Sequence, residues 1–272
     1  MNDKVLIVGA GYIGRRLQRG LDCELSERVI NSFKDAQDLL SEAKPQILIN
    51  CIGNLGRNVD ECDKDPDKTL FSNTFVPVIL AEAALRSNVR FINISTGCIY
   101  HYDYEKDKPV REDKEPDFFE LFYSRSKIYS DKALQSLFTK HPILIVRIRV
   151  PLDNRPDPKN LLTKLINYKK AIDISNSVTY MPDFIDAVKH LVRIKARGIY
   201  NVACKGALFY PKLLEIYKKY VPDFKYEVLE FKKLNIVRTN LILSTDKLEA
   251  SGFKVRTIEE ILEECVKAYL KY

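Results

Sequence analysis

Tyr123 and Lys127 stand four residues apart in the stretch FYSRSK. On a helix this spacing places both side chains on one face, where they can meet at a single site. A tyrosine with its ordinary pKa of about 10 exchanges protons poorly near neutrality, but an adjacent ammonium stabilises the phenolate and lowers that pKa. The pair is therefore suited to general acid catalysis. The alternative is a plain surface pair, because this spacing also arises by chance.

Thr96 and Cys98 form a second group, in the stretch STGCIYHYD at the end of the apolar run VRFINIS. The apolar run predicts a buried strand, which the threonine, glycine and cysteine would end. Residues two apart on an extended exit point to the same side, so the hydroxyl and the thiol would share a face. The alternative is that Cys98 is one more buried thiol.

Three glycines, Gly9, Gly11 and Gly14, give the pattern G-x-G-x-x-G in VLIVGAGYIGRRL. The pattern follows an apolar strand and precedes a helix, a context in which backbone N–H groups and the helix N-terminus can bind a pyrophosphate. The alternative is a glycine-rich structural turn. Because the motif comes at the start of a strand-first chain, we predict a dinucleotide cofactor.

The residues that follow the glycines bear on which nicotinamide cofactor is used. Asp35 has the spacing of a ribose-binding acid, but SFKD also has the pattern of a helix cap with Ser32 as N-cap. We interpret Asp35 as part of the cap. Arg28, with Arg15 and Arg16, could pair with a 2′-phosphate through its guanidinium group. The sequence thus favours NADP(H), with NAD(H) as the alternative.

All these groups require elements that hold them in place. The apolar runs KVLIVG, QILINC, RFINIS and ILIVRIRV alternate with the helical patterns AQDLLSEA, VPVILAEAALRS and IYSDKALQSLF. This alternation predicts an α/β fold, a Rossmann-type doubly wound parallel sheet with helices on both faces. After Pro151 it weakens, which indicates a smaller C-terminal subdomain. We expect the NAD(P)-binding Rossmann domain to comprise residues 1–150 and about 176–204, and the substrate-binding subdomain about 151–175 and 205–272.

Composition and charge argue against several other classes. The chain has 272 residues, of which 46% are hydrophobic, and it lacks the ~20 continuous apolar residues of a membrane span. Its net charge of +7 comes from 44 basic and 37 acidic residues that are interleaved, without the basic stripe that nucleic acid requires. The 6 cysteines and 3 histidines show no metal-ligand or disulfide spacing, so we predict no metal site. The N-terminus lacks a signal-peptide pattern, and we expect a cytoplasmic protein.

These stretches resemble the extended branch of the short-chain dehydrogenase/reductase superfamily. The likeness covers nearly the whole chain, in GAGYIG, NCIG, SNTFVP, STG, YSRSK and GIYNVA. Within that branch the chain most resembles bifunctional nucleotide-rhamnose synthases, which are 3,5-epimerase/4-reductases, through GRNVDECD, PKNLLTK and AIDISNS. It is also similar to dTDP-4-dehydrorhamnose reductases.

The resemblance implies roles for five side chains. Thr96, Tyr123 and Lys127 would be the reductase triad, in which Thr96 and Tyr123 hydrogen-bond the sugar carbonyl oxygen and Tyr123 delivers the proton. Cys98 would move protons at the carbons beside the ketone, with Lys164 as the acid on the other face of the sugar. A thiolate can remove such a proton if donors hold the enolate oxygen. The alternative for Cys98 and Lys164 is a buried thiol and a helix-surface charge.

The motifs and the resemblance also imply two sets of ligand contacts. Contacts with the cofactor would come from Gly9, Gly11, Tyr12, Ile13, Gly14, Arg28, Asn50, Cys51, Gly53, Asn73, Tyr123 and Lys127. Contacts with a nucleotide-sugar substrate would come from Arg57, Asn58, Asn160, Lys164 and Arg238, with Lys159 as a further phosphate ligand. Arg147 and Arg149 lie on one predicted strand, and a buried strand arginine must find either an acid or a phosphate.

We therefore predict a nucleotide-sugar 3,5-epimerase/4-reductase that converts a UDP- or dTDP-4-keto-6-deoxyglucose to the L-rhamnose form with NADPH. One alternative is a 4-ketoreductase only, with epimerisation done by a separate protein. A third hypothesis is a non-catalytic, dinucleotide-binding regulatory subunit, against which the intact set of Thr96, Tyr123 and Lys127 argues. The sequence leaves open the nucleoside of the substrate and the oligomeric state, a homodimer included.

Overall fold

A six-stranded sheet carries the glycine loop and the strand that ends at Thr96. The computed structural model describes residues 3–56, 58–138 and 140–272. The strand order is β10-β5-β4-β3-β1-β2, and the pairs β1/β2, β1/β3 and β3/β4 are parallel. The strands are β1 Val5–Val8, β2 Glu24–Ser26, β3 Ile47–Asn50, β4 Arg90–Thr96, β5 Leu144–Ile148 and β10 Gly198–Val202. This sheet confirms the predicted Rossmann-type fold.

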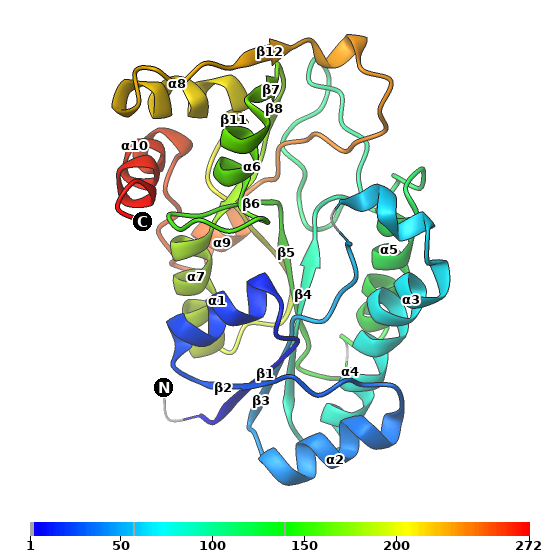
Figure 1. Cartoon of the computed structure of the whole chain (residues 1–272). Helices are drawn as coiled ribbons and strands as arrows, with labels where there is room; N and C mark the ends of the chain where they lie inside the picture. The colour runs from blue at the N-terminus through cyan, green and yellow to red at the C-terminus, as the bar shows by residue number, and fades with distance from the viewer. Residues whose placement is uncertain (1–2, 57, 139) are drawn as a thin grey trace. The chain divides into compact units, whose positions relative to one another are not determined.

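The apolar runs are buried because helices cover both faces of the sheet. All four residues of β1 and all four of β3 are buried, as expected of strands in a parallel sheet. Helix α1 covers one face, while α2, α4 and α5 cover the other (Figure 1). These helices are α1 Tyr12–Leu21, α2 Phe33–Ala43, α4 Val76–Arg86 and α5 Phe122–Gln135.

Two local features shape the helices near the site. Ser32 caps α2, and its hydroxyl accepts a hydrogen bond from the backbone N–H of Asp35. Between α3 (Pro66–Leu70) and α4, the turn η2 (Phe71–Phe75) is π-helical and carries Asn73. A π-helical turn widens the helix locally and often marks a functional site.

The chain divides into two units. Unit 1 comprises residues 1–99, 116–147 and 188–200, and unit 2 comprises residues 100–115, 148–187 and 201–272. Helix α7 (Met181–Arg193) contributes to both, since the division falls within it. The core of unit 1 joins residues of β1, β3 and β4 to residues of α2, α4 and α5.

Unit 2 is built on short strands and helices around a separate core. Strands β6 and β9 pair in parallel, as do β7 and β12, whereas β8 and β11 pair antiparallel. Helices α8 and α10 pack together in this unit, and Thr257 with Glu260 forms a capping box at the start of α10. The elements are β6 Val150–Leu152, α6 Leu161–Tyr168, β7 Lys170–Ile172, β8 Ser175–Asn176, β9 Val178–Tyr180, β11 Leu208–Phe209, α8 Tyr210–Tyr220, β12 Glu227–Leu229, η3 Phe231–Lys233, α9 Asp246–Ala250 and α10 Ile258–Tyr269.

The boundaries of the units differ from the predicted domains, most at residues 100–115 and 176–187. Residues 100–115 belong to unit 2, because Val110 exchanges backbone hydrogen bonds with residues 242 and 244. Residues 176–187 also belong to unit 2, because β9 pairs with β6. Among the described residues no helix is long and apolar enough to cross a membrane.

Candidate active site

The glycine loop between β1 and α1 leaves space at the start of the helix. Gly9 has a positive φ of 102°, and a Cβ there would stand 2.6 Å from the backbone nitrogen of Ile52, so the turn itself requires glycine. A Cβ on Gly11 would meet no protein atom within 4 Å. Gly11 is the N-cap of α1 and makes no side-chain cap. The helix N-terminus is therefore open to an anion such as a pyrophosphate.

Charged side chains follow β2, where the ribose of a dinucleotide would be distinguished. Arg28 pairs with Glu42 at 2.7 Å, and Arg15 pairs with Glu27 at 2.7 Å. Glu27 is the first acidic residue after the second strand, and the sequence pattern did not single it out. Asp35 accepts hydrogen bonds from the backbone of Asn31 and from the Ser32 hydroxyl, which lower its pKa and confirm its place in the cap.

The side chain of Lys127 is largely buried and ends near Gly53, in the segment that follows β3. Its side chain is 5% exposed, and a Cβ on Gly53 would stand 3.1 Å from its Nζ and 3.3 Å from Oδ1 of Asn73. Across residues 3–56, 58–138 and 140–272, no hydrogen bond or ion pair reaches this ammonium. Burial lowers the pKa of Lys127, and the charge of Asp131 opposes that shift. An ammonium at the end of a largely buried side chain, without such a partner, fits a ligand with hydroxyl groups, such as the cofactor ribose.

The segment after β3 is fixed by asparagine side chains. Asn73 accepts from the backbone N–H of Asn54 at 2.7 Å and donates to its carbonyl at 2.9 Å. Asn50 is fully buried, donates to Asn93 at 2.8 Å and accepts from the N–H of Ile52 at 3.0 Å. The Asn50 side chain thus holds the segment after β3 through these two bonds. Burial raises the pKa of the half-buried Cys51 thiol.

Thr96, Cys98 and the start of α5 are joined by two hydrogen bonds. Thr96 ends β4, and its hydroxyl accepts from the backbone N–H of Cys98 at 3.0 Å. The Ser124 hydroxyl donates to the carbonyl of Cys98 at 2.6 Å. Tyr123 and Ser124 stand at the start of α5, so these bonds join the end of β4 to the start of that helix through the backbone of Cys98. The sequence predicted neither the hydrogen bond between Thr96 and Cys98 nor the contact of Ser124 with Cys98.

A buried ion pair lies behind this edge and was also missed. Asp131 Oδ2 accepts from Nε of Arg147 at 3.1 Å, and its Oδ1 accepts from the Ser95 hydroxyl at 2.7 Å. Arg147 therefore meets an acid. Arg149, in unit 2, donates instead to Asn176 at 2.7 Å and to the carbonyl of Thr239 at 2.9 Å.

The side chains that were predicted to contact the substrate differ in burial and in their hydrogen bonds within the protein. Lys164 is half-buried in α6; burial lowers its pKa, and the charge of Lys159 adds to that effect. Asn160 is fully buried, and both ends of its amide bond the backbone of residues 153, 155 and 162. Asn160 therefore caps α6, and both ends of its amide already bond the backbone. Half-buried Arg238 bonds the carbonyl of Val237.

The remaining two predicted contacts lie in unit 1. Asn58 is exposed and caps the short helix η1 (Val59–Asp63) through the backbone N–H of Asp60. Arg57 lies outside the described residues.

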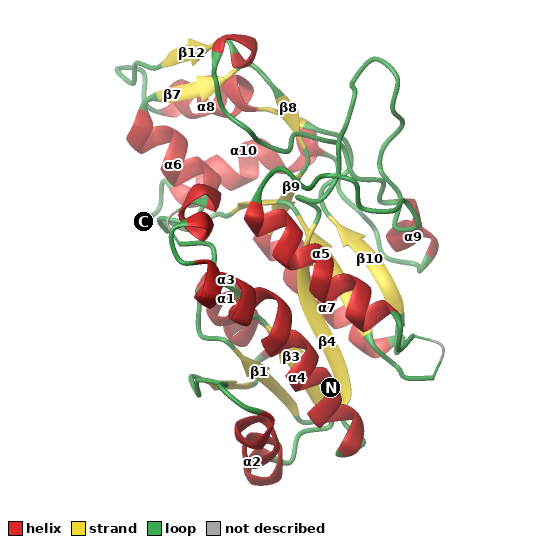
Figure 2. Ribbon diagram, turned by 90° about the vertical axis from the view of Figure 1, so that its right-hand side faces the viewer, coloured by secondary structure: helices red, strands yellow, loops and turns green. Residues whose placement is uncertain are grey.

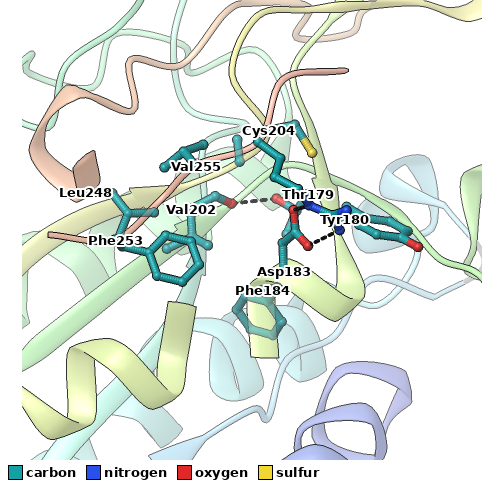
Figure 3. A pocket seen from close by; sticks show the side chains of 11 residues that line it. Thr179, Tyr180, Asp183, Phe184, Val202, Cys204, Leu248, Phe253 and Val255 are labelled. Atoms are coloured by element: carbon teal, nitrogen blue, oxygen red, sulfur yellow. Dashed lines mark hydrogen bonds and ion pairs between the residues drawn. The ribbon is translucent and has the colours of Figure 1, made fainter. Parts of the chain in front are cut away.

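Unit 2 contains two cavities of different size. The larger has a volume of about 310 Å³ and is lined by Tyr104, Phe209 and Phe231 together with Asp173, Ile174, Ser175, Glu230 and Lys232. The smaller, of about 10 Å³, has room for about one water molecule. Figure 3 shows Thr179 beside it donating to the Val202 carbonyl, at 2.7 Å. Of these two cavities, the larger has the size and aromatic lining of a small-molecule site.

The fold and the glycine loop define a dinucleotide-binding protein of the Rossmann type. Residues 5–203 match the model of the NAD dependent epimerase/dehydratase family. The chain therefore belongs to this family.

Two curated relatives come from Arabidopsis thaliana. The chain is 29% identical over 246 residues to the bifunctional dTDP-4-dehydrorhamnose 3,5-epimerase/dTDP-4-dehydrorhamnose reductase, which covers 85% of this chain and 80% of that protein. It is 27% identical over 276 residues to a trifunctional UDP-glucose 4,6-dehydratase/UDP-4-keto-6-deoxy-D-glucose 3,5-epimerase/UDP-4-keto-L-rhamnose-reductase, covering 95% of this chain. The chain spans 41% of the length of that trifunctional relative.

Two solved structures share the fold. The UDP-rhamnose synthase of Acanthamoeba polyphaga mimivirus has a TM-score of 0.91 and 23% identity, covering 98% of this chain and 100% of that chain. The dTDP-4-dehydrorhamnose reductase of Bacillus anthracis, solved in complex with NADP, has a TM-score of 0.82 and 21% identity, covering 97% and 98%.

Proposed function

We propose that the protein is a nucleotide-sugar 3,5-epimerase/4-reductase that converts a UDP- or dTDP-4-keto-6-deoxyglucose to the L-rhamnose form with NADPH. The names of the relatives support this substrate class, since both Arabidopsis proteins carry the 3,5-epimerase and reductase activities. The bifunctional relative supports it most directly, because the match covers most of both chains.

The observation that carries the proposal is the hydrogen-bonded link from Thr96 through Cys98 to Ser124. It ties the backbone of Cys98 to the Thr96 hydroxyl at the end of β4, and to Ser124, the chain neighbour of Tyr123, at the start of α5. Lys127 follows one turn later on α5, with its ammonium buried and reached by no hydrogen bond from the described residues. A hydroxyl, a phenol and an ammonium at one edge are the groups that a carbonyl reduction needs.

The cofactor in this proposal is NADPH, which supplies a hydride to C4 of the sugar. The open N-terminus of α1 at Gly11 would bind its pyrophosphate, and Lys127 would bind its nicotinamide ribose. Arg28 would leave Glu42 to pair with the 2′-phosphate. In the reduction itself, Thr96 and Tyr123 hold the O4 oxygen, and Tyr123 gives that oxygen its proton.

Epimerisation in this proposal precedes reduction and uses two further side chains. Cys98, as thiolate, removes the proton at the carbon beside the ketone while Thr96 and Tyr123 hold the enolate oxygen. Lys164 returns a proton on the opposite face of the sugar. Its burial supports this role, because a lowered pKa eases proton transfer near neutrality.

The larger cavity of unit 2 would take the nucleoside of the substrate. Its volume of about 310 Å³ suits a base with part of its ribose, and Phe209 and Tyr104 are each 42% exposed. Aromatic rings stack on any nucleobase, at about 1–3 kcal/mol per base. Lys232, which lines the cavity together with Asp173 and Glu230, would supply the positive charge for the diphosphate.

The test is a titration of the pure protein with NADPH and NADH, followed by a UDP- or dTDP-4-keto-6-deoxyglucose. We expect tighter binding of NADPH and consumption of one NADPH per sugar, with an L-rhamnose product. Binding of cofactor with no turnover of either sugar would contradict the proposal and favour the regulatory-subunit hypothesis.

A further inference from the structure

Helix α5, which carries Tyr123 and Lys127, buries a polar face. Its buried residues are Ser124, Ser126, Lys127, Ser130 and Asp131, with Ile128 and Leu134 as the apolar ones. Apolar packing does not depend on direction and tolerates small shifts, whereas hydrogen bonds and ion pairs fix direction and distance. The position of α5 along its axis is therefore set mainly by polar contacts.

Three such contacts anchor α5 within unit 1. At its start the Ser124 hydroxyl bonds the Cys98 carbonyl. Two residues later Ser126 accepts from Asn73, and its carbonyl accepts from Thr74, at 3.0 Å and 2.7 Å. Further along, Asp131 bonds Ser95 and Arg147. The first two contacts reach loops and turns, but the third ties α5 to two strands of the sheet.

The third contact is costly and therefore calls for an explanation other than stability. The side chains of Asp131 and Arg147 are each 1% exposed. Burying a carboxylate and a guanidinium costs desolvation energy that their attraction often only balances, so hydrophobic residues in their place would hold the helix as well. What hydrophobic residues would not supply is a fixed direction, and a negative charge close to Lys127.

The hydrogen-bond partners of Asp131 lie next to residues of the proposed active site. Ser95 directly precedes Thr96 on β4, and Asp131 lies one helical turn after Lys127 on α5. Figures 1 and 2 show α5 running beside β4. One carboxylate thus connects the strand residue next to the carbonyl-binding hydroxyl with the helix that carries the other two triad members.

We propose that Asp131 is a positioning residue for the reduction step, which holds α5 and Lys127 in place relative to Thr96 through Ser95 and Arg147. This inference rests on the proposed function, because it takes Thr96, Tyr123 and Lys127 as the reacting set. Asp131 itself contacts neither substrate nor cofactor, since it is fully buried.

The same carboxylate has an electrostatic consequence. The groups that act on the Lys127 charge are Asp131 on α5, Cys51 after β3 and Cys62 in η1, with Arg147 on β5 paired to Asp131. Burial lowers the pKa of Lys127, and Asp131 raises it. Removing the charge of Asp131 would lower the pKa of Lys127 further, so the lysine would lose its proton at a lower pH.

Three variants of the full-length protein separate positioning from plain stability. Asp131→Asn removes the charge, Ser95→Ala removes one hydrogen bond and keeps the charge, and Leu134→Ala is the matched control on the same buried helix face. We measure unfolding, kcat, KM, and NADPH binding, each over a pH series. Leu134→Ala should lower stability and leave the kcat of the folded enzyme unchanged.

We expect Asp131→Asn to lower kcat by about 10-fold or more, since small misplacements of reacting groups cost up to about 100-fold. It should also move the alkaline limb of kcat and of NADPH binding to lower pH. Ser95→Ala should lower kcat, by less, with the alkaline limb where it is in the wild type.

The proposal is overturned if folded Asp131→Asn keeps the wild-type kcat and alkaline limb, or loses only stability as Leu134→Ala does. If Asp131→Asn does not fold, Ser95→Ala decides, and an unchanged kcat in that variant overturns the proposal. If the wild type turns over no sugar, the proposed function fails separately. The pH dependence of NADPH binding then tests Asp131 alone, and an unshifted limb in Asp131→Asn contradicts the inference.

Discussion

At the scale of single residues, the state of the Lys127 ammonium is the most informative feature. Burying a charged amine is unfavourable, and Lys127 does so with no hydrogen bond from the described residues. A Cβ on Gly53 would stand 3.1 Å from Nζ of Lys127 and 3.3 Å from Oδ1 of Asn73, so these groups lie close to Gly53. Such an ammonium can donate hydrogen bonds to the hydroxyl groups of a ligand. We therefore assign the ribose of the cofactor to this position.

The proton donor of the reduction can be tested by Tyr123→Phe. The variant should bind NADPH nearly as the wild type does, because Lys127 and the glycine loop are unchanged. Its turnover should fall by about 10²–10⁴-fold, which is the usual loss when a positioned general acid is removed. Steady-state kinetics and fluorescence titration with NADPH measure both effects. If Tyr123→Phe turned over as fast as the wild type, the reductase assignment would be wrong.

Cofactor choice can be tested at the pair of Arg28 and Glu42. Arg28→Ala should weaken NADPH binding by about 10-fold and leave NADH binding unchanged, because a charge-assisted hydrogen bond to the 2′-phosphate is lost. Glu42→Gln is the matched control, which frees Arg28 from its ion pair and should bind NADPH at least as tightly as the wild type. Equal affinities for the two cofactors in the wild type would show that Arg28 has no such role.

At the scale of elements, the loop between β1 and α1 separates two uses of glycine. Gly9→Ala forces a side chain onto a positive φ and against the Ile52 backbone, so the folding stability should fall by about 1–3 kcal/mol or more. Gly11→Ala adds a Cβ in open space at the N-cap, so it should cost about 0.5 kcal/mol.

NADPH binding should be weakened by Gly11→Ala, although this variant costs little folding stability. Gly11→Ala should raise the Kd for NADPH by at least about 10-fold, because the methyl group occupies space that a pyrophosphate would use. Thermal unfolding and NADPH titration of the two variants check this. If Gly11→Ala binds NADPH normally, the open space at α1 is not the pyrophosphate site.

The elements also show how far local patterns in the sequence extend. The glycine turn, the cap at Ser32 and the helix with Tyr123 and Lys127 follow from spacings of three or four residues, and each was predicted. The Asp131 pair with Arg147 could not be predicted in the same way. Its residues are 16 apart, and the pairing depends on where β5 lies in the sheet. The local bonds of Asn50 and Asn160 could not be predicted either, because an asparagine that binds a ligand and one that fixes a loop share one sequence pattern.

At the scale of the whole molecule, the chain forms two units with separate cores, as the two separate binding functions that we propose would require. The sequence indicated a second subdomain from the weakened alternation after Pro151. It could not show that residues 100–115 belong there, because that membership rests on hydrogen bonds with residues 242 and 244. The aromatic cavity of unit 2 went unpredicted for the same reason, since Tyr104, Phe209 and Phe231 are far apart in the chain.

The separation of functions can be tested by Phe209→Ala. The ring is 42% exposed, so its loss should change stability little. The KM for the nucleotide sugar should rise by about 5- to 150-fold, which corresponds to the loss of one base-stacking contact. The Kd for NADPH should stay as in the wild type. Tyr168→Ala, an exposed aromatic of unit 2 outside the cavity, is the control, and equal KM values for the two variants would exclude the cavity as the nucleoside site.

The central claim, that one protein both epimerises and reduces, is tested most directly by deuterium exchange. In D₂O without NADPH, the wild type should introduce deuterium at C3 or C5 of the 4-keto sugar, because deprotonation precedes reduction. Cys98→Ser should lose most of this exchange, since an alcohol ionises far less readily than a thiol. The same variant should still reduce a keto sugar that is already epimerised, because Thr96, Tyr123 and Lys127 are intact. A wild type that shows no exchange at either carbon, yet reduces the pre-epimerised sugar well, would contradict the claim and make the enzyme a reductase only.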